Sequence, residues 1–505
     1  MTQLDETFTT PIRGPKPDRR RQAQGRAVRR AWRIHFYAAL FSAPFLVLLA
    51  LTGLVILYTA PLSEALHRDL LTVTPRATSV SLEQQRTAAA AAFPDLSIDM
   101  VVPPSAADRS TMIELTDGAD LYQNVFVDPY SGQVLGSMES GADLIGLSNR
   151  LHGWLAADDL TVTLPSLQHL VDPDSPSSVD IRVGDIVIEV AAIWGLVLAM
   201  SGVFLWWPRS SQKGKPLMRI RWSKGGRLRW RDLHVAGGMV LAAVLAFFVL
   251  SGMPWSTYWG AAWASAASKI TPNDTFDAPG STPVAAGSVD RLGHRIPWAI
   301  RTDDVPASAP ATDALPAALS LDSVTRIAAQ EGMLPGYSIL LPVDDTSDPA
   351  APVYGTYQLS NAWPGKVEDE RVVYLDQFTG RTLGVSDPTS WGFLNRATEW
   401  GVQNHMGTQY GLVSKVLMTL GCALTILSVV TGGIMWWKRR PKGSTGLPKR
   451  STRDASRASS VAVLGIALVL GVMYPVWGVT ALVVLGLDAA VGAARRARAR
   501  RHAPA

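Results

Sequence analysis

The chain has a single cysteine among its 505 residues, so it cannot form an internal disulfide. Zinc sites built on several cysteines and cysteine-ligated iron–sulfur clusters are excluded for the same reason. Cys422 lies inside an apolar run, where it is interpreted as a small core residue. The sequence also has no Walker loop, no dinucleotide fingerprint and no nucleophile elbow, which leaves nucleotide chemistry and serine hydrolysis without support.

Charged residues are scarce, at 18% of the chain, whereas hydrophobic residues make up 47% and occur in long blocks. A hydrocarbon core of about 30 Å needs roughly 20 apolar residues in a helix. Four runs meet this requirement, and a fifth block is interrupted by Pro475. The predicted spans are residues 31–60, 186–207, 231–258 and 412–437, with the C-terminal block at 459–492. The sequence therefore predicts an integral membrane α-helical bundle of four core helices plus this block.

The formal net charge of +5 does not indicate nucleic acid as a partner, because the basic residues gather at the ends of the apolar runs. Such clusters mark cytoplasmic flanks. They predict a disordered basic tail at 1–30 and basic cytoplasmic loops at 208–230 and 438–458. Residues 61–185 and 259–411 are then external. Basic residues on both sides of the last block favour two short helices hinged at Pro475 over one kinked span.

The two halves of the chain resemble each other, which predicts a tandem internal repeat. The second and fourth spans end alike, in Ser201-Gly202 and Thr431-Gly432 followed by paired tryptophans that we assign to an interfacial aromatic belt. Each external segment has an Asp-x-x-[Ser/Thr]-Gly hairpin pattern, at Asp128–Gly132 and Asp376–Gly380, preceded by a helical stretch. These stretches are Leu82–Ala92 and Leu321–Gln330. Each half thus comprises two spans and a small external α+β unit.

Two of the eight histidines occupy matching places in this repeat. His35 opens the first span and His234 opens the third, and each is followed 17 positions later by a small hydroxyl residue and glycine. Those dipeptides are Thr52-Gly53 and Ser251-Gly252. Ionisable side chains at a membrane boundary are costly and usually mark function, and imidazole is a common axial ligand of haem iron.

A second matching pair, His152 and His405, lies on the external approaches to the second and fourth spans. A helix rises about 1.5 Å per residue, so His35 cannot share a ligand sphere with either of them. Two sites follow, one near each face of the membrane. Small residues one turn after the inner histidines, at Ala38, Ala39, Gly237 and Gly238, leave room for a porphyrin, although they also suit close helix packing.

The ordinary alternative for any one histidine at a helix start is a capping or snorkelling role, and duplication alone could preserve a structural histidine. The remaining histidines have no symmetry of this kind and are assigned to the surface; they are His67, His169, His294 and His502. Zinc or copper fits less well than haem, because structural zinc uses four tethered ligands. Two facing histidines at one depth suit a six-coordinate iron.

These features resemble the PepSY-associated transmembrane family over about residues 30–490. The resemblance is carried by the basic N-terminus, Trp32 to Tyr37, Leu51-Thr52-Gly53, Leu151-His152-Gly153, the Ser/Thr-Gly…Trp-Trp helix ends and the two hairpins. That family includes iron-regulated inner-membrane proteins and di-haem ferric-siderophore reductases. The resemblance implies two PepSY-like external domains. The segment 157–179, which contains His169, departs from the short approach to the second span that is usual in the family.

The resemblance further implies electron transfer across the cytoplasmic membrane through two non-covalent b-type haems, since no C-x-x-C-H motif is present. The iron ligands would be His35 with His234 and His152 with His405. Arg33, Arg150 and Arg231 are candidate haem-propionate partners, with lipid-headgroup snorkelling as the equal alternative. The acceptor would be a ferric siderophore or another ferric chelate outside, and the absence of flavin and NAD motifs suggests quinol as the donor.

Two other functions are compatible with the same sequence features. The external domains could form a binding or protease-regulating module that the helices only anchor, but such a module needs no paired histidines at membrane depth. The two-fold repeat also suggests a transporter. The spans, however, hold no convincing ionisable residue at mid-membrane, apart from Glu189 and Lys415 near the external ends.

Overall fold

The computed structural model describes residues 19–119, 121–207, 220–223, 226–274, 296–310, 317–440 and 457–501. The chain divides into two compact units. One unit comprises residues 1–43, 193–242 and 428–505, and the other comprises residues 44–192 and 243–427. Each unit contains part of each of the four longest apolar helices.

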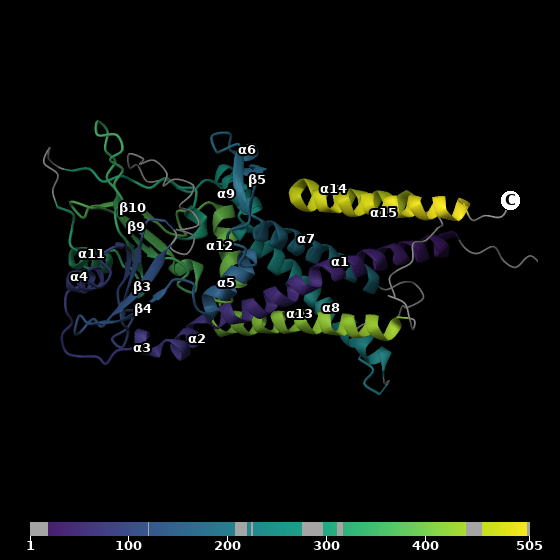
Figure 1. The fold of residues 1–505 in the computed structure, drawn as a ribbon, viewed down its shortest axis with the longest axis horizontal. Coiled ribbons are helices and arrows are strands. Elements are labelled where there is room, and N and C mark those ends of the chain that lie inside the picture. The colour runs from purple at the N-terminus through teal and green to yellow at the C-terminus, as the bar shows by residue number, and fades with distance from the viewer. Residues whose placement is uncertain are drawn as a thin grey trace, which may run out of the picture. The chain divides into compact units, whose positions relative to one another are not determined.

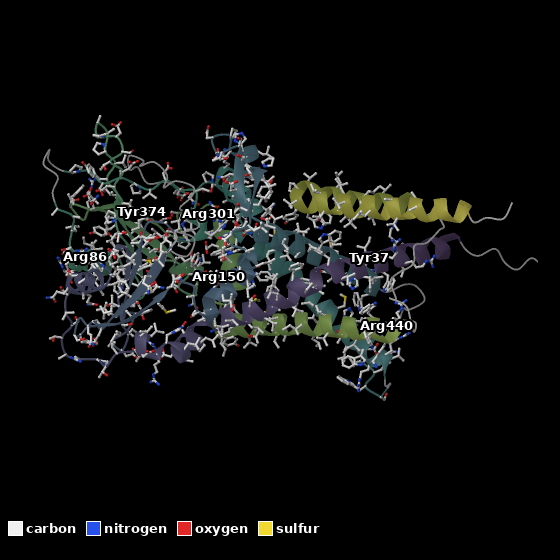
Figure 2. All side chains as sticks on the ribbon, in the orientation of Figure 1. Tyr37, Arg86, Arg150, Arg301, Tyr374 and Arg440 are labelled. Atoms are coloured by element: carbon white, nitrogen blue, oxygen red, sulfur yellow. The ribbon has the colours of Figure 1, made fainter. Side chains whose placement is uncertain are left out.

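These four helices are α1 (Arg19–Leu57), α7 (Val183–Trp206), α8 (Arg227–Gly252) and α13 (Leu412–Arg439), as Figure 1 shows. Each is long and apolar enough to cross a membrane. Large apolar side chains project outward along them, among them Tyr37 (Figure 2), Leu40 and Leu250, and the two leucines are both 60% exposed. Apolar surface of this extent is favourable against lipid rather than water. The protein is therefore a membrane protein, as the sequence predicts.

The helix boundaries differ from the predicted spans at several places. Helix α1 begins at Arg19, so residues 19–30 are helical and not part of a disordered tail. Arginine, alanine and glutamine dominate this stretch and are strong helix formers. Helix α8 ends at Gly252 rather than at residue 258, because Pro254 cannot continue it. A 3₁₀ turn η2 (Met253–Trp255) and helix α9 (Tyr258–Ile270) follow.

The C-terminal block forms two helices, α14 (Arg457–Met473) and α15 (Pro475–Arg501). A Cβ atom built on Gly478 would lie 2.9 Å from the Cα atom of Gly471. Residues seven apart in a straight helix would be about 10 Å apart. The two helices therefore fold back on each other at this point. In the same unit, the Trp194 and Trp477 rings pack with centroids 5.4 Å apart.

The second unit contains an eight-stranded antiparallel sheet in the order β10-β9-β8-β7-β1-β2-β3-β4. The strands are β1 (Ser97–Val102), β2 (Thr111–Thr116), β3 (Tyr122–Val127), β4 (Val134–Glu139), β7 (Ser338–Leu340), β8 (Thr356–Asn361), β9 (Arg371–Asp376) and β10 (Thr382–Ser386). The strands of the two predicted α+β units thus form one sheet rather than two. Strands β1 and β7 join them, because each would otherwise present an unpaired edge.

The two expected hairpins form at the outer strands of this sheet. Strand β3 pairs with β4 and strand β9 pairs with β10. In each turn the aspartate accepts hydrogen bonds from backbone amides two or three residues on, and the glycine has a positive φ, 74° at Gly132 and 72° at Gly380. A side chain at either glycine would be strained there. Asp128 and Asp376 therefore act as the predicted turn residues.

Helices α4 (Leu82–Ala92) and α11 (Leu321–Gln330) have the predicted bounds and lie side by side next to the sheet (Figure 1). Their N-termini cap each other: Asp322 accepts from the Leu82 amide at 2.8 Å, and Glu83 accepts from the Leu321 amide at 3.3 Å. Carboxylates at helix N-termini are favourable partners for these unpaired amides. The main hydrophobic core lies between these helices and the sheet.

Short elements complete the second unit. They are α2 (Thr59–Leu66), α3 (Arg68–Leu71), α5 (Leu144–Trp154), α6 (Leu167–Val171), α12 (Phe393–His405), the 3₁₀ turns η4 (Trp298–Ile300) and η5 (Val367–Asp369), and the strand pair β5 (Thr161–Pro165) and β6 (Ser178–Arg182). The strand pair and α6 account for most of the segment 157–179. This segment is anchored by Tyr258, whose hydroxyl donates to the Pro165 carbonyl at 2.8 Å.

Candidate functional site

The first histidine pair lies in the first unit. His35 of α1 and His234 of α8 face each other with ring centroids 6.4 Å apart and ring planes at 81°. Nδ1 of His35 lies 3.1 Å from the Leu198 carbonyl, and Nδ1 of His234 lies 3.1 Å from the Ser428 carbonyl. A carbonyl only accepts, so Nδ1 carries the proton in both rings and Nε2 keeps its lone pair.

The second pair, in the second unit, repeats this geometry. His152 of α5 and His405 of α12 have ring centroids 6.4 Å apart and ring planes at 80°. Backbone carbonyls again accept from the two rings, those of Leu49 for His152 and Phe248 for His405. Helices α5 and α12 thus supply one histidine each to this pair, while α1 and α8 supply the histidines of the first pair.

A hydroxyl side chain fixes each of the four rings. Nδ1 lies 3.0–3.2 Å from a hydroxyl oxygen in every case. Each hydroxyl also donates to a carbonyl of its own helix, so it accepts from the imidazole N–H. The four combinations are His35 with Ser201, His234 with Thr431, His152 with Thr52, and His405 with Ser251. This contact holds the ring plane and the tautomer together.

A glycine follows each of these hydroxyl residues and lies against the ring. A Cβ atom at Gly202, Gly432, Gly53 or Gly252 would lie 3.1–3.3 Å from Cε1 of the histidine concerned. That distance is shorter than an ordinary carbon–carbon contact of about 3.5–4.0 Å. The Ser/Thr-Gly dipeptide is thus a seat for one imidazole: the hydroxyl binds Nδ1, and the missing side chain leaves space for the ring edge.

Both pairs have the spacing that a metal ion between two imidazoles requires. Two metal–nitrogen bonds of about 2.0–2.1 Å, plus about 1.1 Å from each nitrogen to its ring centre, place the centroids about 6.3 Å apart. The observed value is 6.4 Å in both pairs. Among the described residues, Nε2 of these histidines makes no hydrogen bond, and no group of three or more His, Cys, Asp or Glu side chains is placed to hold a metal ion.

The positions one turn after the two inner histidines differ in the space that they leave beside the rings. A Cβ atom built on Gly238, one turn after His234, would meet no atom within 4 Å, whereas Ala38, one turn after His35, is buried. Burial, together with the neighbouring His405, lowers the pKa of His152 to about 4. Burial likewise lowers the pKa of His405 to about 4. Both rings are therefore neutral near pH 7, which is the form of imidazole that ligates metals.

The three arginines expected near propionates occupy different surroundings. Arg33 and Arg150 each precede a histidine by two positions, which is about 200° around a helix, so they point away from the histidine face. The Arg150 guanidinium lies 3.7 Å from the carboxylate of Asp158, within the segment 157–179. Arg231 precedes His234 by three positions, shares its helix face and is exposed.

Two of the remaining histidines have structural partners. Nε2 of His67 lies 3.1 Å from Asp143, which caps helix α5, and Nδ1 of His169 lies 2.7 Å from the Ser175 carbonyl. His294 and His502 lie outside the described residues. Glu189 accepts from the Tyr258 and Trp259 amides and so caps helix α9.

The ring contacts of Ser201-Gly202 and Thr431-Gly432 are not among the sequence-based predictions, which use these dipeptides only as evidence of the repeat. Thr52-Gly53 and Ser251-Gly252 are noted there without a contact partner. The sequence does contain a pattern that could have predicted these contacts. A small hydroxyl residue followed by glycine occurs once in each of the four long helices, and each of these dipeptides lies at the same membrane depth as one of the paired histidines. Cys422, interpreted as a core residue, is buried, and its Sγ lies 4.0 Å from the position that a Cβ atom on Gly53 would take.

Comparison with known proteins supports the resemblance. The family model described as PepSY-associated TM region matches residues 32–439, about four fifths of the chain, and includes all four paired histidines. A search of curated proteins found no match. The chain therefore belongs to the PepSY-associated transmembrane family.

Proposed function

We propose that this membrane protein is a di-haem b oxidoreductase that passes electrons across the cytoplasmic membrane to a ferric siderophore or a similar ferric chelate. The observation that carries the proposal is the identical geometry of two histidine pairs, each with the spacing of a bis-imidazole metal site. A structural histidine needs one partner for its ring. It does not need a second imidazole facing it at 6.4 Å with both Nε2 atoms unprotonated.

The residues of the chain fit a pair of b-type haems. His35 and His234 would hold one iron and His152 and His405 the other, and bound haem iron would carry single electrons between its ferrous and ferric states. The four hydroxyls hold the rings in the ligating tautomer, and the four glycines let the rings approach the long helices. Arg231 is the arginine best placed for a propionate, since it shares a helix face with His234.

The spacing of the seats along single helices supports transport across the bilayer. Helix α1 carries His35 and, 17 residues later, the Thr52-Gly53 seat of His152. Helix α8 carries His234 and, at the same interval, the Ser251-Gly252 seat of His405. Seventeen residues correspond to about 26 Å of helix rise, most of a hydrocarbon core of about 30 Å. The equal intervals also support a tandem repeat of two equivalent halves.

The positive-inside rule supports the orientation. Helix α13 ends in Lys438 and Arg439, and α8 begins at Arg227 within a basic segment. These ends would be cytoplasmic, with the His35–His234 pair near them and the sheet-containing region external. Quinol in the membrane would serve as electron donor. Without redox activity, the same fold would be a membrane-anchored PepSY binding or protease-regulating module.

The test is electron transfer across a sealed membrane. Purified protein is reconstituted into liposomes with an impermeant reductant inside and a ferric chelate with a ferrous indicator outside. We expect ferrous iron to appear outside only when the protein is present, and His35→Ala to abolish it. His169→Ala, a histidine outside both pairs, serves as the control and should retain the rate. Equal rates in His35→Ala and in the unaltered protein would refute the proposed electron path.

A further inference from the structure

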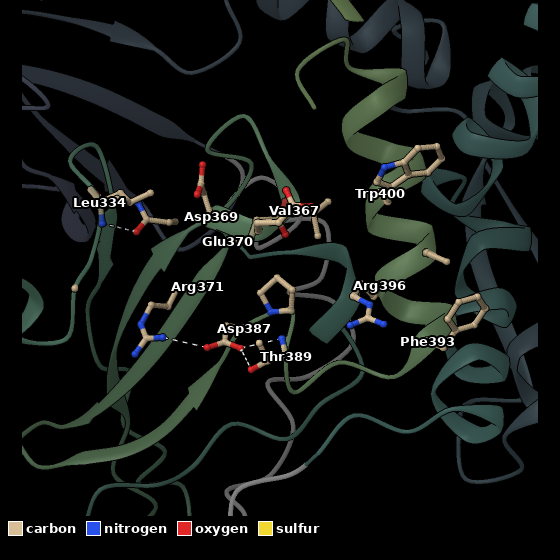
Figure 3. A pocket seen from close by; sticks show the side chains of 15 residues that line it. Leu334, Val367, Asp369, Glu370, Arg371, Asp387, Thr389, Phe393, Arg396 and Trp400 are labelled. Carbon is tan, nitrogen blue, oxygen red and sulfur yellow. Dashed lines mark hydrogen bonds and ion pairs between the residues drawn. The ribbon is translucent and has the colours of Figure 1, made fainter. Parts of the chain in front are cut away.

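A cavity of about 770 Å³ lies in the sheet-containing unit between helix α12, the turn η5, the start of strand β9 and the residues that follow β10. Figure 3 shows Phe393, Arg396 and Trp400 along α12 on one side of it and Arg371 with Asp387 on the other. Phe393 is 66% exposed and Trp400 is 42% exposed. These three α12 residues, spaced by three and four positions, share one helix face. They offer aromatic surface and a cation to an organic molecule.

Glu370 lines this cavity and yet is only 1% exposed. Its Oε1 accepts from Nε2 of Gln403 on α12. Its Oε2 has no hydrogen-bond partner of regular geometry among the described residues. A buried ionised carboxylate with an unsatisfied oxygen is strongly disfavoured, because no water or donor replaces its hydration. Glu370 is therefore placed to carry a proton.

A second buried carboxyl group, that of Glu399, lies within hydrogen-bonding reach of Glu370. Glu399 of α12 is fully buried, and its oxygens accept from Nε1 of Trp363 and the amide of Ala299, each at 3.1 Å. These two donors and the Trp298 amide stabilise a negative charge on Glu399, whereas the Gln403 amide alone supports a charge on Glu370. Burial raises the pKa of both groups, and the charge of Glu399 raises the pKa of Glu370 further. Two carboxyls sharing a dry site cannot both ionise, so this pair holds one proton near neutral pH.

The charged groups around the two carboxyl groups do not allow both of them to ionise. Glu368 of η5 adds a further negative charge near Glu370. Arg371, the cation next in the chain, is engaged by Asp387 at 3.1 Å and by Glu331 at 3.7 Å. Arg396 lines the cavity from α12 and is exposed to solvent. Asp369 lines the same wall and is also exposed.

The pair is also joined to the helix that ends at His405. Gln403, which donates to Glu370, lies two positions before His405 and is fully buried. Its own Oε1 accepts from the Thr408 hydroxyl at 2.5 Å. Trp400 on the cavity wall precedes His405 by five positions, about 7.5 Å of helix rise. One short helix therefore carries a cavity wall, a buried carboxyl group and one of the paired histidines.

We propose that the cavity binds an oxygen-donor ferric chelate and that Glu370, paired with Glu399, donates a proton to the chelate when its iron is reduced. This inference rests on the proposed function. Haem held by His152 and His405 would supply one electron to the chelated iron, and the Fe–O bond that then breaks leaves its electron pair on the chelator oxygen. The released chelator oxygen takes the proton from Glu370, which becomes a carboxylate and regains a proton from solvent through the cavity.

The first test is the infrared spectrum of the full-length protein at neutral pH, in water and in deuterium oxide. We expect a C=O band of a protonated carboxyl group that shifts on deuteration and is lost in Glu370→Gln. Asp345→Asn should keep the band, because hydrogen bonds from Ser347 lower the pKa of Asp345, which is already ionised. If Glu370→Gln does not fold, Glu399→Gln should alter the band instead. A wild-type spectrum without such a band overturns the proposal.

The second test is single-turnover reoxidation of reduced protein by a ferric trihydroxamate, followed at the haem bands. We expect Glu370→Gln to react about 100-fold more slowly with unchanged haem content. The wild-type rate should fall with rising pH, and the variant should lose this dependence. A wild-type rate in Glu370→Gln refutes the proton-donor role. Absence of haem in every preparation would refute the proposed function instead, while the infrared band would still decide the protonation of Glu370.

Discussion

The seat formed by a glycine beneath each histidine gives the sharpest mutational test. In Gly432→Ala the new Cβ would lie 3.3 Å from Cε1 and 3.7 Å from Nδ1 of His234. The ring must then move by a few tenths of an ångström to restore a contact of about 3.5–4.0 Å. Ligand geometry at a metal site tolerates displacements of about 0.5 Å, so we expect weakened rather than abolished binding. A loss of about 10-fold in haem affinity, or about 1.4 kcal/mol, is the expected size.

The adjacent glycine provides a matched control. A Cβ atom at Gly433 would meet nothing within 4 Å, and it lies on the same helix. Both alanine substitutions gain up to about 1 kcal/mol of helix propensity, so their difference isolates the contact with His234. Haem content and the rate of haem transfer to apomyoglobin are measured for both, and also for Gly432→Val and Gly433→Val. Equal haem retention in the two valine variants would refute the steric reasoning.

Three other measurements probe the hydroxyl contacts, the ring orientations and the hairpin turn. Removing the hydroxyl that binds His405, in Ser251→Ala, should lower the affinity of one haem about 10- to 100-fold, whereas Ser251→Thr should retain it in the haem-transfer assay. Ring planes at 80–81° predict strongly anisotropic low-spin EPR signals of the ferric protein, and signals typical of parallel imidazoles would contradict this. Burial raises the pKa of Asp376, but amide hydrogen bonds lower it by more, so its pKa is lower in the folded protein than in the unfolded chain. The carboxylate therefore stabilises the fold at pH values above the unfolded-state pKa, and this stabilisation is lost as the pH falls through the folded-state pKa. Asp376→Asn should cost about 2 kcal/mol at pH 7 and less at acid pH in denaturant unfolding, and a pH-independent cost would oppose the turn assignment.

The paired histidines could be predicted from sequence because the repeat marks them twice. Equal spacing from His35 and His234 to a Ser/Thr-Gly dipeptide indicated that the two histidines have a common role. The rise per residue of a helix indicated that the two histidine pairs lie at different depths in the membrane. The partner of each dipeptide could not be predicted. Thr52-Gly53 follows His35 in the chain but seats His152, and only the packing of α5 against α1 determines this.

Other features could not be predicted, because they depend on contacts between residues that are far apart in the sequence. The junction of β1 with β7 unites the strands of both halves in one sheet, yet neither strand differs in pattern from an edge strand. The buried position of Glu370 is likewise invisible in the sequence, because nothing there distinguishes it from Glu368, which is exposed. By contrast, helix geometry alone could have shown that Arg33 and Arg150 do not lie on the same helix face as the histidines that follow them.

The central claim is that the two histidine pairs each hold one haem. The most direct measurement is the absorption spectrum of detergent-purified protein, oxidised and dithionite-reduced, with haem quantified per chain. We predict about two b-type haems per chain, falling to about one in His234→Ala and in His405→Ala. A colourless protein from haem-replete cells would contradict this claim and would favour a PepSY binding module anchored in the membrane.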